Sequence, residues 1–195
     1  MKIALAVVAA AFALSLAAAD AAPKAPPTVV HRFAAYDTDG KLRGTLRITK
    51  RIAGSCWIGS IVTTRTDACR CDASNVIYDP CFSASDTARE VACVIDPFSP
   101  QTTMMRLTKP LPHGGDDLAG NGGVPWGVRT TDGHRCTYAA GMTNIVQHMR
   151  ANYFCSDGTV YYGAPDPHAQ PWSIAVGTAG GLRDSLRVGV VEAVF

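Results

Sequence analysis

Cysteine is the residue type that most limits what this chain can fold into. Seven cysteines lie between residues 56 and 155 of a 195-residue sequence. Thiols pair in an oxidising compartment, and an odd number leaves one thiol without a partner. If the chain is exported, the sequence therefore predicts a fold tied by three disulfides, with one free cysteine.

The first residues predict export. A short basic start is followed by an apolar run, residues 3–16, and then by three alanines at residues 17–19. This is the order found in a secretory signal peptide. The apolar run is shorter than the roughly 20 residues that span a bilayer, so we expect a secreted or periplasmic protein without a membrane span. The expected organisation is a signal peptide at 1–19, a Pro-rich leader at 20–28 and a single disulfide-bonded β domain at 29–195.

Turn residues predict an antiparallel β fold. Asp-Gly pairs are typical of tight hairpin turns, and they stand at residues 39–40, 132–133 and 157–158. The first pair separates residues 29–36 from residues 42–48, and we expect these two segments to form a hairpin. The last ten residues alternate between apolar and polar and then change parity after Val190, which predicts a closing strand with a β-bulge.

Helical patterns are weak. Residues 85–91 fit a short helix with a polar start, and residues 143–150 fit either a helix or a strand. We therefore expect an all-β fold of mostly antiparallel hairpins, sandwich- or barrel-like and disulfide-stapled, with one or two short helices. Tyr161 and Tyr162 must point to opposite faces of the last hairpin, so we expect one of them to be exposed.

A Gly-rich loop, residues 110–125, separates five cysteines from the last two. Cys136 and Cys155 are therefore expected to pair across adjacent strands, closing a segment whose bridge contributes about 3 kcal/mol. Because binding residues concentrate on loops, His113, Asp116 and Asp117 are candidate binding residues.

Charge and spacing exclude several functions. The chain has 18 Lys and Arg against 16 Asp and Glu and no basic run, which argues against a nucleic-acid partner. Zinc sites use cysteines roughly two to four residues apart together with matching His, whereas Cys69 and Cys71 are separated by one residue. Residues 37–40 resemble the start of a Ca²⁺ loop but lack its closing Glu, so a turn explains them better. We expect no metal and no other cofactor.

Several motifs resemble those of a group of uncharacterised exported bacterial proteins. The most specific are Gly54-Ser55-Cys56-Trp57-Ile58-Gly59-Ser60 and Asp79-Pro80-Cys81-Phe82, and the resemblance covers about residues 54–175. In that group six cysteines recur, and a Trp typically takes the place of Cys69. The resemblance implies an extracytoplasmic disulfide domain with Cys69 as the free thiol and no catalytic residue. The cysteines implied to pair are Cys56, Cys71, Cys81, Cys93, Cys136 and Cys155.

The three tryptophans, Trp57, Trp126 and Trp172, each follow a cysteine or a proline. Aromatic side chains in such places usually pack as core, and the alternative is a stacking platform for a sugar. We therefore expect a binding or interaction module, not an enzyme, whose ligand is an envelope or extracellular glycan or protein.

Two alternatives stay open: a secreted hydrolase with an unrecognised site, and a thiol redox protein that uses Cys69 and Cys71. An enzyme would bring ionisable groups together in a pocket, whereas a binding module would show an aromatic or apolar patch.

Overall fold

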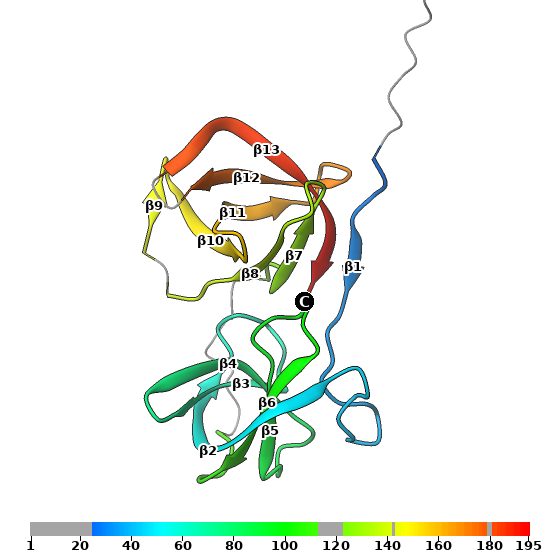
Figure 1. The fold of residues 1–195 in the computed structure, drawn as a ribbon, viewed down its shortest axis with the longest axis vertical. Helices are drawn as coiled ribbons and strands as arrows, with labels where there is room; N and C mark the ends of the chain where they lie inside the picture. Colours follow the sequence, from blue (N-terminus) through cyan, green and yellow to red (C-terminus); the bar gives the residue numbers. More distant parts are fainter. Residues whose placement is uncertain (1–24, 113–122, 142, 179–180) are drawn as a thin grey trace, which may run out of the picture.

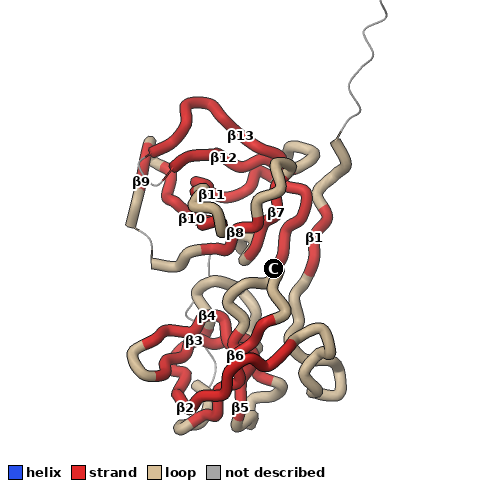
Figure 2. Tube along the Cα trace, in the orientation of Figure 1, coloured by secondary structure: helices blue, strands red, loops and turns tan. Residues whose placement is uncertain are grey.

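The computed structural model describes residues 25–112, 123–141, 143–178 and 181–195. As predicted, the protein is all-β, mostly antiparallel and held by three disulfides. Its strands form two closed groups, drawn one above the other in Figure 1. Within the described residues there is no helix, and Figure 2 shows strands joined by loops throughout.

The first barrel consists of five strands. Each strand pairs antiparallel with the next, and the first and last then pair in parallel to close the barrel. When an odd number of strands alternate in direction, the first and last run the same way, so this closure has to be parallel. The strands are β2 (Arg47–Gly59), β3 (Ala68–Ala73), β4 (Val76–Ser83), β5 (Glu90–Cys93) and β6 (Gln101–Leu107).

The second barrel has six strands and closes by an antiparallel pairing of β7 with β13. Two short strands lie outside it: β1 (Val29–His31) runs parallel to β13, and β9 (Ile145–Val146) pairs with β10. The barrel strands are β7 (Gly127–Thr130), β8 (Arg135–Tyr138), β10 (Met149–Cys155), β11 (Val160–Asp166), β12 (Trp172–Thr178) and β13 (Gly181–Val194).

The predicted Asp-Gly turns of the second barrel are present. Gly133 lies between β7 and β8 and Gly158 between β10 and β11, with φ angles of 89° and 88°. Glycine tolerates this left-handed backbone, which other residues rarely adopt. The predicted C-terminal bulge is also confirmed, because the register between β13 and β7 shifts between Val190 and Glu192.

The predicted N-terminal hairpin is wrong. A single bridge between Tyr36 and Leu42 joins its two segments, while β1 pairs with β13 and residues from Arg47 onward belong to β2. The Asp37 side chain caps the turn by accepting hydrogen bonds from the backbone N–H groups of Asp39 and Lys41. Apolar side chains of residues 33–46 pack against the outer face of β4, β5 and β6.

The expected short helices are replaced by turns and strands. Residues 85–88 form one turn, in which the Ala88 N–H donates to the Ser85 carbonyl, and β5 begins at Glu90. Residues 145–146 form β9 and residues 149–150 begin β10, with a turn at residues 147–148 between them, so the strand alternative for residues 143–150 is the one found. A helix of one turn carries the full cost of nucleation, and strand pairing offers these residues more hydrogen bonds.

The expected exposure of Tyr161 or Tyr162 is also wrong, since both are fully buried. Tyr161 points into the second barrel, as the interior cluster shows. Tyr162 lies on the outer face, where Val146 and Met149 cover it and Asn144 donates to its hydroxyl. β11 therefore has a buried layer on each side.

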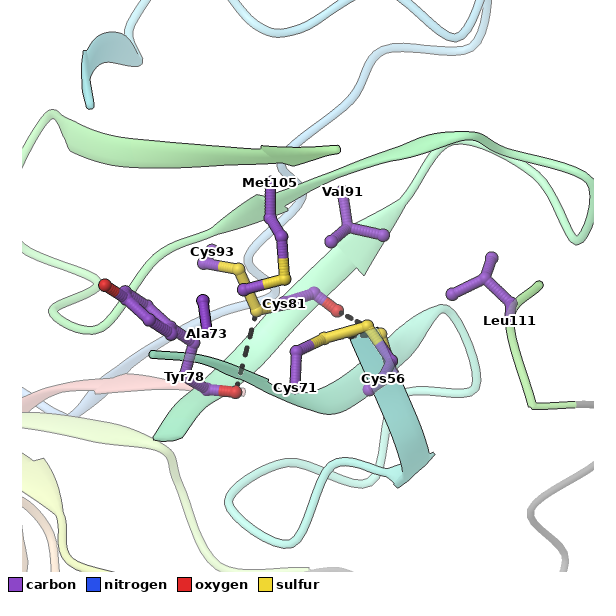
Figure 3. Packing of buried hydrophobic residues seen from close by; sticks show 10 residues of the cluster. Cys56, Cys71, Ala73, Tyr78, Cys81, Val91, Cys93, Met105 and Leu111 are labelled. Carbon is purple, nitrogen blue, oxygen red and sulfur yellow. Dashed lines mark hydrogen bonds between the residues drawn. A yellow bond between two sulfur atoms is a disulfide. The ribbon is translucent and has the colours of Figure 1, made fainter. Parts of the chain in front are cut away.

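Disulfides form much of the first barrel's interior. Cys56–Cys71 and Cys81–Cys93 lie beside Met105 and Val91 (Figure 3). Both bridges join residues that face each other on neighbouring strands. The second barrel holds the third bridge, Cys136–Cys155, which is the expected pair and is likewise cross-strand.

An aromatic cluster joins the two barrels. Trp126, which directly precedes β7, packs its ring 5.0 Å from that of Phe33 and 5.8 Å from that of Phe82, measured between ring centroids. Phe82 belongs to β4 of the first barrel and is fully buried. The contact fixes the first barrel against the start of the second.

Candidate binding site at Trp57

The three predicted tryptophans have different environments. Trp126 is 1% exposed in the contact between the barrels, and Trp172 is half-buried against the interior of the second barrel. Trp57 is 47% exposed, so its ring is open to a ligand. The remaining predicted binding residues, His113, Asp116 and Asp117, lie outside the described residues.

A β-bulge places Trp57 on the outer surface of the first barrel. In the pairing of β2 with β3, Cys56 faces Cys71 and Ile58 faces Arg70, so Trp57 is the extra residue on its strand. Bulges re-aim side chains in this way. Cys56 turns inward to its disulfide, and Trp57 turns outward.

Arg70 on β3 lies beside the exposed ring. Its guanidinium carbon is 5.8 Å from the Trp57 ring centroid, within the range of a cation–π contact. Its Nε is buried and makes no hydrogen bond to any described residue, and it lies 4.0 Å from Asp79 Oδ2. Arg70 therefore sets a guanidinium beside an open aromatic surface.

Asp79 on β4 lies beside Arg70 and is the next residue of the site. Its carboxylate accepts hydrogen bonds from the Ser60 hydroxyl at 2.6 Å and from the Ile61 N–H at 3.2 Å. Burial raises the pKa of Asp79, while these two hydrogen bonds and Arg70 act in the opposite direction. The carboxylate is thus held in one position behind the guanidinium. We refer to Trp57, Ser60, Arg70 and Asp79 together as the Trp57 site.

The Trp57 site gathers residues from motifs that are distant in the sequence. Trp57 and Ser60 come from the first motif and Asp79 from the second, whereas Arg70 directly precedes Cys71. Sequence reasoning named Trp57 as a binding residue and missed the other three. A signal was available: neighbours of inward-pointing, paired cysteines on a strand point outward, so Trp57 and Arg70 share a face once Cys56 pairs with Cys71.

This arrangement suits a ligand with an apolar face and several hydroxyl groups. The indole offers a flat surface for C–H groups and the guanidinium offers donors, while the buried Asp79 carboxylate holds the guanidinium in place.

The environment of Cys69 does not favour the redox alternative. Cys69 is the one free cysteine, 5% exposed, and its Sγ lies 3.5 Å from Cys71 Sγ, which is bonded to Cys56. Burial, followed by the charges of Asp79 and Asp67, raises the pKa of the Cys69 thiol to about 12. The thiolate is the reactive form, so Cys69 is inert at neutral pH.

The sulfur atoms of Cys56, Cys69 and Cys71 lie within 4.8 Å of one another, and so do those of Cys71, Cys81 and Cys93. Metal binding by cysteine needs thiolates, and of these five cysteines only Cys69 is outside a disulfide. Both clusters therefore act as covalent staples in this structure.

One group of ionisable residues bears on the hydrolase alternative. His134 Nδ1 lies 3.0 Å from Asp157 Oδ2, and its Nε2 lies 3.5 Å from Asp132 Oδ2. The Tyr161 hydroxyl lies 3.4 Å from Asp132 Oδ1. A general base needs a nitrogen that faces its substrate, whereas both nitrogens of His134 face carboxylates. The group ties two hairpin turns together.

Comparisons with protein-family models, with curated proteins and with solved structures found no match. The fold and the Trp57 site define a disulfide-bonded double barrel with an open aromatic surface. None of the described segments forms a helix with the length and apolar character needed to cross a membrane. The three disulfides fit an oxidising compartment outside the cytoplasm.

Proposed function

We propose that this protein is an exported binding module that recognises a glycan of the cell envelope at the Trp57 site and has no catalytic role. The observation that carries the proposal is the exposed Trp57 ring with the Arg70 guanidinium beside it. Sugars present both an apolar face and hydroxyl groups, and these two features match the ring and the guanidinium respectively.

Two further features support the proposal. The N-terminal sequence predicts secretion, and the three disulfides fit the compartment in which an envelope ligand would be met. The rigidity of the site also favours binding, because its strands are tied by Cys56–Cys71 and its carboxylate is held by two hydrogen bonds. A preorganised site loses little entropy when a ligand binds.

Calorimetric titration tests the proposal with three probes: a soluble peptidoglycan fragment, an N-acetylglucosamine tetramer and a neutral glucose oligomer. We expect at least one of them to bind. Trp57→Ala should weaken that binding about tenfold or more, since a buried aromatic contact is among the strongest in an interface. Arg70→Gln should weaken it as well, while keeping most of the side-chain volume.

Ile145→Ala is the matched control, because Ile145 is a 65% exposed apolar residue of β9, which pairs with β10 away from the first barrel. It should leave glycan affinity unchanged. Equal affinity of the wild type and Trp57→Ala for the bound glycan would contradict the Trp57 site. Failure of all three probes, together with saturable binding of an envelope protein, would replace the glycan by a protein ligand.

A further inference from the structure

A second candidate site lies on different strands of the first barrel. An open surface pocket of about 590 Å³, called the cavity below, lies where the turn after Tyr36, the loop after β4 and strands β5 and β6 meet. This volume is within the range of about 300–1,000 Å³ that is usual for small-molecule sites. The residues that line it are Tyr36, Leu42, Ala84, Ala88, Arg89, Glu90, Met104 and Arg106.

The floor and walls of the cavity are apolar. Met104 is buried at its base, and Tyr36 and Leu42 form one wall, paired across their turn. Ala84 and Ala88 also line it, and their short side chains leave the space open. Methionine adapts its shape to flexible aliphatic groups. The cavity therefore suits an aliphatic chain.

The rim of the cavity is positively charged. Arg89 and Arg106 line it, together with Glu90. Glu90 lies opposite Arg106 in the pairing of β5 with β6 and 4.0 Å from Arg51 of β2, so the arginines outnumber the single lining acid. Guanidinium groups recognise carboxylates through paired hydrogen bonds. The rim therefore favours an anionic head group.

Tyr36 adds a hydroxyl donor to the wall. Burial and the charge of Glu90 raise the pKa of Tyr36 to about 12. Its hydroxyl consequently keeps its proton at neutral pH, and it can donate a hydrogen bond to an anion beside the arginines.

We propose that this cavity binds a small amphipathic carboxylate, with its aliphatic chain on Met104 and Leu42 and its head group at Arg89 and Arg106. The proposal is independent of the Trp57 site, which is built on β2, β3 and β4. It gives the first barrel a second ligand of a different chemical class.

Calorimetric titration of the full protein with sodium decanoate below its micellar concentration tests the proposal. We expect saturable binding of decanoate, none of decyltrimethylammonium, which has the same chain with a cationic head, and none of acetate. The double variant Arg89→Gln with Arg106→Gln should bind decanoate at least about tenfold more weakly. The matched control is Arg32→Gln with Arg135→Gln, two exposed arginines outside the cavity lining, which should bind decanoate like the wild type.

Filling the cavity gives a second, independent test. Ala88→Trp should abolish decanoate binding, and Ala84→Trp, at an exposed position, should do so with less risk to folding. Near-UV circular dichroism checks that each variant keeps its native packing, and glycan binding by these variants should equal that of the wild type. Decanoate affinity that is unchanged in a folded Ala84→Trp variant would overturn the proposal. Absence of decanoate binding at millimolar concentration, or equal binding of the cationic amphiphile, would overturn it too.

Discussion

At the scale of single residues, burial decides the chemistry of Cys69. The thiol lies among disulfides and donates toward the Cys81 carbonyl at 3.2 Å, yet its raised pKa keeps it protonated. A protonated thiol beside a bridge does not exchange with it, because only the thiolate attacks a disulfide. The three native pairings are thereby protected from the seventh cysteine.

The reactivity of Cys69 follows from this pKa. We expect iodoacetamide to alkylate native Cys69 at pH 9 at least about a hundredfold more slowly than the same residue in urea, because a thiol with a pKa of about 12 is almost wholly protonated at that pH. The native rate should rise as the pH increases from 9 toward 12. Mass spectrometry of timed samples measures it. Equal rates in the native and urea-unfolded protein would contradict the assignment.

At the scale of elements, each disulfide joins two neighbouring antiparallel strands at directly opposed residues. Such a bridge holds the strand register, since a shift of one residue would turn the side chains to the wrong face. Cys136–Cys155 has this role between β8 and β10, which are separated in the sequence by β9.

Removal of that bridge should destabilise the protein. We expect the double variant Cys136→Ala with Cys155→Ala to lower the free energy of unfolding by about 3 kcal/mol, mainly by freeing the unfolded chain. Urea denaturation followed by circular dichroism measures the change. Cys69→Ala is the control: it removes a buried sulfur but no bridge, and should cost about 1 kcal/mol. A bridge variant as stable as this control would contradict the role given to the disulfide.

Local elements were predictable where the signal was local. The Asp-Gly turns and the parity change after Val190 both depend on neighbouring residues, and both are found. The prediction of an N-terminal hairpin was wrong because β1 pairs with Glu192–Val194 of β13, at the far end of the sequence. The prediction that Tyr161 or Tyr162 is exposed was wrong because side chains of another segment, Val146 among them, bury Tyr162.

At the scale of the whole molecule, the two barrels touch closely at Gly127. A Cβ atom at this position would lie 2.4 Å from Pro97 Cγ and 3.0 Å from Phe98 Cε2. Pro97 and Phe98 belong to the loop between β5 and β6, so Gly127 permits the barrels to approach beside Trp126.

A methyl group at this contact should strain it. We expect Gly127→Ala to lower the free energy of unfolding by about 1–3 kcal/mol, because the Pro97 and Phe98 rings must move. Urea denaturation followed by tryptophan fluorescence measures the loss. Gly44→Ala is the matched control, since no atom lies within 4 Å of a Cβ added there. Equal stability of the two variants would show that the contact accommodates the methyl group without strain.

The candidate site was predictable in part. The outward position of Trp57 could be predicted once Cys56 was paired inward with Cys71, whereas Asp79 joins the site from another strand, which no local pattern indicates. The cavity between Tyr36 and Arg106 depends on how the N-terminal segment crosses the first barrel, so no local pattern could have shown it.

Whether a barrel has an odd or an even number of strands decides where the polypeptide enters and leaves it. The chain enters the five-stranded barrel at one end and leaves it at the other, so the segments before and after this barrel are held apart by its length. The six-stranded barrel begins and ends at a paired position, Gly127 opposite Val194. Its ends could be joined by a short link at little entropic cost, or the unit could be carried on a surface turn of an unrelated host without forcing the host's flanking segments apart.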